Sequence, residues 1–153
     1  MEFGILLRHP MNEKGLGAMV RLERIIKKYS TGESDIIVRC HDYFRLERFM
    51  QEFPGKLYPG GTVETTGEIT TAMAGLPLVL KFSAYRERLG KPHRPGIISV
   101  FHIAAELNLD IRERLAFATL TMPKRETYLE SRIEFQGKLL DAEERSRDVF
   151  HLN

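Results

Sequence analysis

Two strongly apolar runs flank a basic segment between Pro77 and Leu107, and this pattern constrains the fold more than any other in the chain. The runs cover residues 78–82 and 97–105, and they are the best candidates for a buried core. We predict a strand at residues 78–82. Residues 97–107 are open to two interpretations, strand or helix, because a short apolar run does not separate the two by periodicity.

The basic segment at residues 81–94 is the most cationic place in the sequence, and its glycines and prolines predict a shaped loop. The candidate anion-binding residues are Lys81, Tyr85, Arg86, Arg88, Lys91, His93 and Arg94. Cations of this kind neutralise phosphates, and aromatic rings stack on bases. We therefore predict a non-enzymatic protein that binds an anionic partner, with nucleic acid favoured over another phosphate-bearing ligand.

Two other interpretations of residues 81–94 remain open. Charges on such a loop also keep the edge of a hairpin soluble without binding anything. Alternatively, the loop is an arm that inserts into a neighbouring subunit, which would make the chain a structural or assembly subunit and a homo-oligomer.

The rest of the chain mixes strand and helix patterns without strict alternation, which predicts an α+β fold. We expect a single compact domain over residues 1–153, with a mixed sheet and two or more packing helices; an open α/β sheet is the alternative. Strands are predicted at residues 3–7, 35–40, 62–66, 78–82, 115–121 and 129–135, and helical segments at 16–29, 42–53, 68–74, 110–114 and 141–150. One core is expected to hold Leu22, Ile26, Phe49, Leu80, Val100 and Phe135.

Composition excludes several classes of protein. No run approaches the roughly 18 apolar residues that a membrane span needs, and the first residues lack the basic start of a secretory signal. The single cysteine, Cys40, excludes an intramolecular disulfide and favours a cytoplasmic location. We place Cys40 on an inner strand, where its thiol would react slowly. The histidines show no metal-ligand spacing, so we expect no metal and no cofactor.

An enzymatic alternative starts from Arg8 and His9 at the end of the first predicted strand and from His102 in the later apolar run. An arginine–histidine pair after strand one, with a later histidine, resembles the histidine phosphatase superfamily. The resemblance implies phosphoryl transfer, with the first histidine taking the phosphoryl group and arginines binding it. Pro10 stands where that family has a glycine, and no glycine follows His102.

A second nucleic-acid interpretation uses residues 102–117, which have the pattern of a helix-turn-helix. Ile103 and Leu107 would face the core, and Asn108 would occupy the tight turn. Residues 112–114 would then open a recognition helix that points towards a major groove. The alternative is a core helix that ends in an exposed turn.

Overall fold

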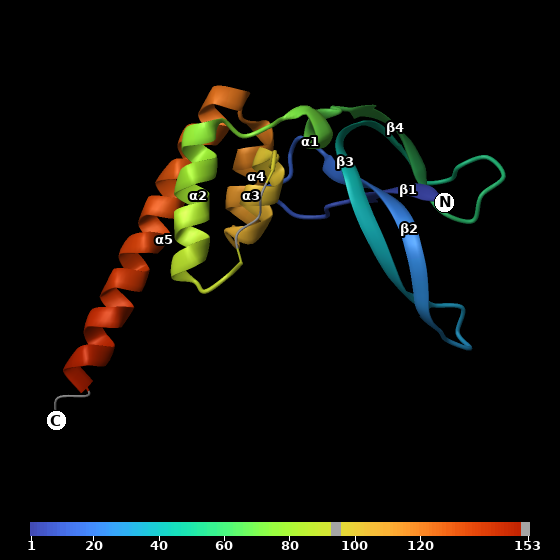
Figure 1. Ribbon diagram of the computed structural model, residues 1–153. Helices are drawn as coiled ribbons and strands as arrows, with labels where there is room; N and C mark the ends of the chain where they lie inside the picture. The colour runs from blue at the N-terminus through green and yellow to red at the C-terminus, as the bar shows by residue number, and fades with distance from the viewer. Residues whose placement is uncertain (93–95, 151–153) are drawn as a thin grey trace. The chain divides into compact units, whose positions relative to one another are not determined.

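The computed structural model describes residues 1–92 and 96–150, and the side chains of these residues up to Arg147. It divides into two compact units, residues 1–71 and residues 72–153. The first unit carries the sheet, and helices α2 to α5 make up the second (Figure 1). The predicted α+β class is confirmed. The prediction of one domain over residues 1–153 stays a prediction.

The sheet contains four strands in the order β1-β2-β3-β4, and every neighbouring pair is antiparallel, where a mixed sheet was expected. The strands are β1 (Glu2–Leu6), β2 (Leu16–Lys28), β3 (Ser34–Met50) and β4 (Gly60–Thr65), followed by the short helix α1 (Glu68–Thr71). The predictions of strands at 3–7, 35–40 and 62–66 and of a helical turn after residue 68 are confirmed. The β2–β3 hairpin runs well beyond the ends of β1 and β4 (Figure 1).

The helix predicted at residues 16–29 is wrong, because these residues form β2. Leu22 pairs with Val38 and Ile25 pairs with Ile36, so all four side chains share one face of the hairpin. Register shifts after Leu22 and after Ile25 insert an extra residue each time. The apolar spacing along β2 therefore becomes three instead of two, which imitates the period of a helix.

The helix predicted at residues 42–53 is also wrong, because β3 continues to Met50. A register shift between Leu46 and Arg48 again produces a spacing of three. Asp42 is buried and accepts hydrogen bonds from the backbone N–H of Tyr43 and Gly67, both at 2.8 Å. Asp42 thereby fixes the start of α1 beside the strand.

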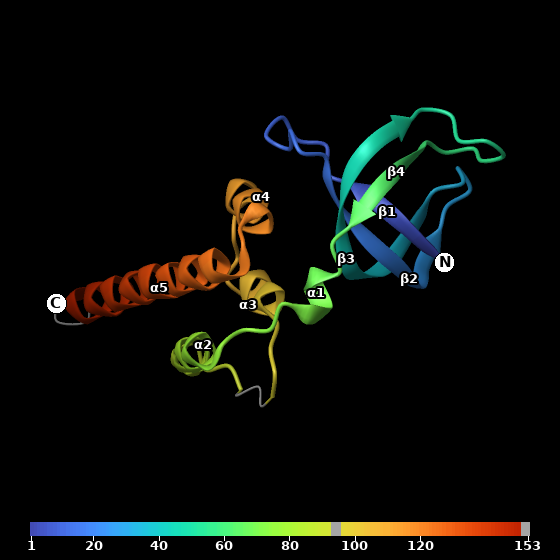
Figure 2. The same cartoon turned by 90° about the horizontal axis from the view of Figure 1, so that it is seen from above.

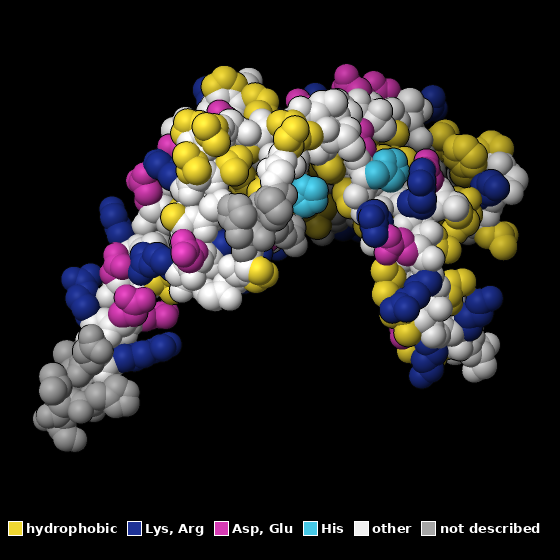
Figure 3. Space-filling model, viewed as in Figure 1, with side chains coloured by type: hydrophobic (Ala, Val, Ile, Leu, Met, Phe, Trp, Pro, Cys, Tyr) yellow, Lys and Arg dark blue, Asp and Glu magenta, His cyan; other side chains and the backbone are white. Residues whose placement is uncertain are grey.

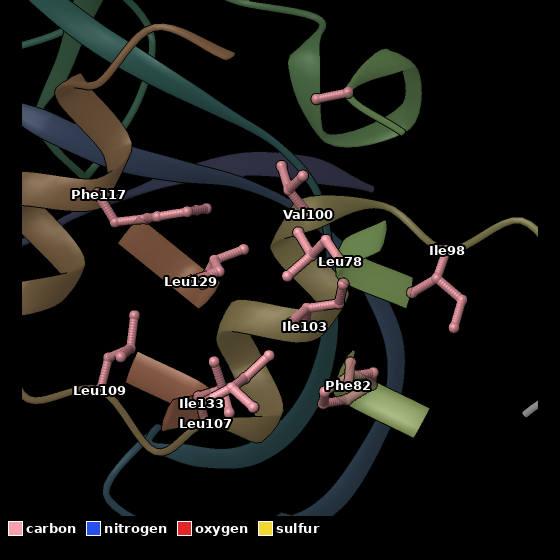
Figure 4. Close-up of a cluster of buried hydrophobic side chains, with 11 residues drawn as sticks. Leu78, Phe82, Ile98, Val100, Ile103, Leu107, Leu109, Phe117, Leu129 and Ile133 are labelled. Carbon is pink, nitrogen blue, oxygen red and sulfur yellow. The ribbon is translucent and has the colours of Figure 1, made fainter. Parts of the chain in front are cut away.

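The second unit packs its helices around one apolar cluster (Figure 4). The helices are α2 (Leu76–Arg88), α3 (Val100–Glu106), α4 (Ile111–Thr119) and α5 (Met122–Phe150). The buried cluster comprises Ala72, Leu78, Phe82, Ile98, Val100, Ile103, Leu107, Leu109, Phe117, Leu129 and Ile133. Segment 97–107 is thus mainly helical, and the helical predictions at 110–114 and 141–150 are confirmed.

Three strands predicted in this unit are helical instead, at residues 78–82 and 129–135 throughout and at 115–121 as far as Thr119. In α2, Leu78 and Phe82 are four residues apart and both are 1% exposed, whereas Leu80 between them is 60% exposed. In α5, Leu129 and Ile133 are likewise four residues apart and buried. Burial therefore follows the helical period in both segments.

The predicted common core is wrong in composition. Of its six members only Val100 is buried, and Leu22 is half-buried. The other four are about half exposed or more, namely Ile26, Phe49, Leu80 and Phe135. The first unit instead buries Leu16, Val20 and Phe44. Phe44 needs Gly17, because a Cβ at that glycine would lie 2.3 Å from the Phe44 ring.

Candidate functional site

The basic segment at residues 81–94 is not a loop over its first eight residues, which belong to α2. Lys81 Nζ lies 2.9 Å from carboxylate oxygens of both Glu130 and Glu134 on α5. The Glu130 and Glu134 hydrogen bonds raise the pKa of Lys81, and the same ammonium lowers the pKa of Glu134. The exposed cation at the start of the segment therefore joins two helices.

Arg88 and Tyr85 also contact residues of α5. Arg88 Nη2 lies 2.7 Å from Asp141 on α5. The Tyr85 hydroxyl donates a hydrogen bond to Gln136, and burial raises the pKa of that hydroxyl. Gln136 in turn donates to the Leu107 carbonyl at 2.6 Å, which connects α2, α5 and the end of α3.

Arg86 is the most buried member of the predicted site. Its guanidinium forms an ion pair with Glu106 on α3 and donates to the Pro92 carbonyl at 3.0 Å. The ring of Phe82 lies 5.8 Å from the guanidinium carbon. A buried arginine with a carboxylate partner holds the helices in place and is not displayed to a solvent-borne anion.

Lys91 is exposed, and His93 and Arg94 lie outside the described residues. Anion binding by Lys81, Tyr85, Arg86, Arg88, Lys91, His93 and Arg94 stays a prediction. A phosphate at Lys81 or Arg88 would have to compete with carboxylates that are already in contact. The observed contacts account for the positions of Lys81, Tyr85, Arg86 and Arg88 without any anion.

The residues of the phosphatase interpretation occupy different units. Arg8 is exposed, and Nδ1 of the half-buried His9 accepts a hydrogen bond from the Met11 backbone N–H at 3.2 Å. His102 is exposed on α3. Convergence of Arg8, His9 and His102 stays a prediction. Among the described residues, no group of three or more His, Cys, Asp or Glu side chains has an arrangement that could hold a metal ion.

The local helix-turn-helix is present as α3 and α4, and Asn108 takes the left-handed turn with φ of 50°. Asp110 caps α4 and forms a capping box with Glu113. Glu113 also pairs with Arg132 on α5 at 2.9 Å, and Arg114 donates to the Leu109 carbonyl at 2.8 Å. These side chains serve the packing of α4, and its entry into a DNA groove stays a prediction.

The most exposed apolar side chain of the first unit, that of Leu57, lies on the loop between β3 and β4, residues 51–59, which we call the apolar loop. Its backbone turns at Gly55, with φ of 74°, and the Lys56 N–H donates to the Phe53 carbonyl at 3.0 Å. The Phe53 ring lies over Gly60, where a Cβ would come within 2.3 Å of it. The loop therefore has a defined shape set by glycines at its turn and at its end.

The three large apolar side chains of the apolar loop are exposed to solvent. Leu57 is fully exposed, Tyr58 is 60% exposed and Phe53 is 37% exposed. The loop extends beyond the sheet in Figure 2, and hydrophobic side chains gather over this part of the molecule in Figure 3. Exposed apolar groups that lie next to one another are a feature of interaction surfaces.

The sequence contained a signal for this loop that the helical interpretation obscured. Phe49 and Phe53 fall in the helix predicted at residues 42–53, although Pro54-Gly55 and Gly60-Gly61 bracket a segment of hairpin-loop character. Phe49 pairs with Gly61 across β3 and β4 and is about half exposed. A prediction of two strands joined by a turn would have placed the rings of Phe49 and Phe53 at the surface.

Comparisons with known proteins establish the fold and not the activity. The sequence matches no protein-family model, and no curated protein matches it. The chain is similar in structure to a Lon N-terminal domain protein from Xanthomonas campestris, with a TM-score of 0.60 and 18% identity. The similarity covers 86% of this chain and 75% of that protein. At this identity the similarity shows a shared fold alone. No described helix is long and apolar enough to span a bilayer.

Proposed function

We propose that this chain is a non-enzymatic binding module that holds an extended apolar segment of another polypeptide on the apolar loop. The observation that carries the proposal is the exposure of Leu57 and Tyr58 on a loop whose shape is fixed by Phe53 and Gly60. The fold is shared with a Lon N-terminal domain protein, and this similarity supports a role as a binding module but names no partner.

The chemistry of the loop favours a polypeptide partner. Aromatic residues are enriched in the cores of protein–protein interfaces, where a polar rim surrounds them. The loop supplies aromatic rings and a leucine beside the charged Glu52 and Lys56. Full burial of an exposed leucine contributes about 1.5–3 kcal/mol, so each apolar side chain of the loop that a partner covers would add to the free energy of binding.

A matched pair of double variants tests the proposal. Leu57→Ser with Tyr58→Ser should weaken binding of a reduced, alkylated unfolded polypeptide by at least tenfold. Leu76→Ser with Leu80→Ser removes exposed leucines of the helical unit, which are 68% and 60% exposed, and should leave binding unchanged. Fluorescence anisotropy of the labelled polypeptide gives both affinities, and circular dichroism confirms that each variant folds.

Three results would contradict the proposal. Equal loss in both double variants would show unspecific apolar adhesion. Failure of the unmodified protein to bind the unfolded polypeptide would show that it does not have the proposed function. Binding to neutral phospholipid vesicles, lost with the loop variant while the polypeptide is ignored, would make the loop a membrane contact.

Nucleic-acid binding through the basic segment at residues 81–94 is the second candidate. It rests on the exposed Lys91 and on the part of Arg88 that remains accessible, 38% of its side chain. The carboxylates of Asp141 and Glu144 lie against that arginine, so a phosphate contact there would displace them.

A further inference from the structure

One edge of the β2–β3 hairpin is uncovered. Residues 34–40 of β3 pair with β2 on one side, whereas β4 pairs with β3 only from Phe44 onward. Within the described residues, no strand lies against the other side of 34–40. An exposed strand edge presents a row of backbone N–H and C=O groups that pairs readily with another strand.

This edge is regular, which makes it a good template. The pairing with β2 uses every β3 residue from Ser34 to Cys40 in turn, and the extra residues lie in β2. Side chains therefore alternate strictly along the edge strand. Ser34, Ile36, Val38 and Cys40 share one face, while Asp35, Ile37 and Arg39 share the other.

We propose that the occupant of this edge is a second copy of the same chain, paired antiparallel about Ile37. In this register Ile37 meets its own counterpart, and Ile36 lies opposite Val38. Asp35 lies opposite Arg39, and the twofold axis repeats that pair. Apolar residues meet apolar ones and opposite charges meet, so the seven-residue edge is complementary to itself.

The charged groups keep free atoms for the pairing. Asp35 accepts from the Tyr29 hydroxyl at 2.7 Å through Oδ2, and Arg39 donates to Glu23 at 2.5 Å through Nε. Within the described part of the chain, Asp35 Oδ1 and both terminal nitrogens of Arg39 make no other hydrogen bond. A bidentate arginine–carboxylate contact between copies fits these atoms.

The seven-residue pairing also ends before the part of β3 that other residues contact. The Thr66 N–H donates to the Tyr43 carbonyl and the Gly67 N–H to Asp42, and both of these β3 residues lie beyond Cys40. Phe44, where β4 begins to pair, would lie opposite residue 30 of the second copy, in the hairpin turn. The outer edge of β2 offers a poorer self-pairing surface. It carries Arg24 and Lys28, which would face like charges of a second copy, and its register shifts interrupt the ladder.

Charge reversal tests the pairing on the full chain, and the test is independent of the apolar loop. Sedimentation equilibrium should show a dimer for the native protein. Asp35→Arg or Arg39→Glu alone should raise the dimer dissociation constant at least tenfold, because each places like charges opposite one another. Mixing the two single variants should restore a dimer, since every opposed pair then has opposite charges.

The restored mixed dimer is the decisive result, because unfolding or a general loss of charge would not produce it. Arg39 is 76% exposed, so the substitution leaves the interior intact, and circular dichroism verifies this. A native protein that is monomeric at 100 μM concentration, or single variants that stay monomeric when mixed, would overturn the proposal.

A cysteine substitution tests the register itself. Ser34→Cys should give a disulfide-linked dimer on mild oxidation, between the introduced thiol and Cys40 of the second copy. The two positions in one chain are six residues apart along a strand, about 20 Å, and cannot bond to each other. Ser34→Cys combined with Cys40→Ser should stay uncrosslinked. Equal crosslinking in this control would show that the register is wrong.

Discussion

Leu78 and Leu80 on α2 give a direct test of how the helical unit is built. The side chain of Leu78 is 1% exposed in the apolar cluster, and that of Leu80 is 60% exposed. Leu78→Ala removes buried methyl and methylene groups and leaves a cavity, which costs about 2–5 kcal/mol of unfolding free energy. Leu80→Ala removes atoms that are already largely hydrated, so its cost should stay within about 0.5 kcal/mol.

Urea unfolding followed by circular dichroism at 222 nm measures this difference, because α2 to α5 supply most of the helical signal. The midpoint should fall clearly for Leu78→Ala and hardly at all for Leu80→Ala, with the slope unchanged for both. Similar losses from the two substitutions would mean that residues 78–82 alternate as a strand. That result would refute the helical placement of α2 and the cluster built on it.

Three further predictions follow from individual contacts. Glu106→Ala leaves the Arg86 guanidinium buried beside an empty position and should cost about 3–5 kcal/mol in the same urea experiment, whereas Arg86→Met with Glu106→Leu should cost much less. Cys40 lies on β3, where a strand was predicted, but its side chain is exposed, and partial burial raises the pKa of its thiol. A disulfide reagent should therefore label it completely but slowly at pH 7, with the rate still rising above pH 9. If nucleic acid binds through the basic segment at residues 81–94, the logarithm of the binding constant should fall linearly with the logarithm of the salt concentration. Arg88→Ala with Lys91→Ala should make this slope on duplex shallower by about 0.9 for each phosphate that is no longer neutralised. Anisotropy titrations at several salt concentrations measure the slope, and an unchanged slope would show that these residues do not bind phosphate.

The sequence predicted the fold class but exchanged helix and strand in both halves of the chain. In β2, bulges space Leu22 and Ile25 three residues apart, and in β3 a bulge does the same for Leu46 and Phe49. An apolar spacing of three is the signature of a helix when pairing partners are unknown. Only the register, which depends on a neighbouring strand, shows that the extra residues are bulges.

The helical half failed for the opposite reason. Residues 78–82 and 129–135 satisfy an alternation of two as well as a spacing of four, because Leu80 and Phe135 are apolar although exposed. A five-residue run contains too few periods to decide between them. The cations of α2 were correctly recognised as a cluster, but the carboxylate partners of Lys81 and Arg88 lie about 50 residues later on α5, and one sequence does not reveal that proximity.

The apolar loop and the β3 edge together predict a difference between short and long partners. A dimer paired through β3 carries two apolar loops, so a long unfolded chain can occupy both while a short peptide occupies one. The second contact is then intramolecular. It raises the apparent affinity of the dimer for the long chain above that of one loop by about 10²–10⁴-fold where both loops can bind at once. Arg39→Glu should therefore weaken binding of a long unfolded polypeptide by more than tenfold and leave a peptide with one apolar stretch unaffected. Anisotropy titrations with the two ligands measure both effects. Equal weakening for the two ligands would place Arg39 in the binding surface itself, and no weakening for either would show that the two loops act separately.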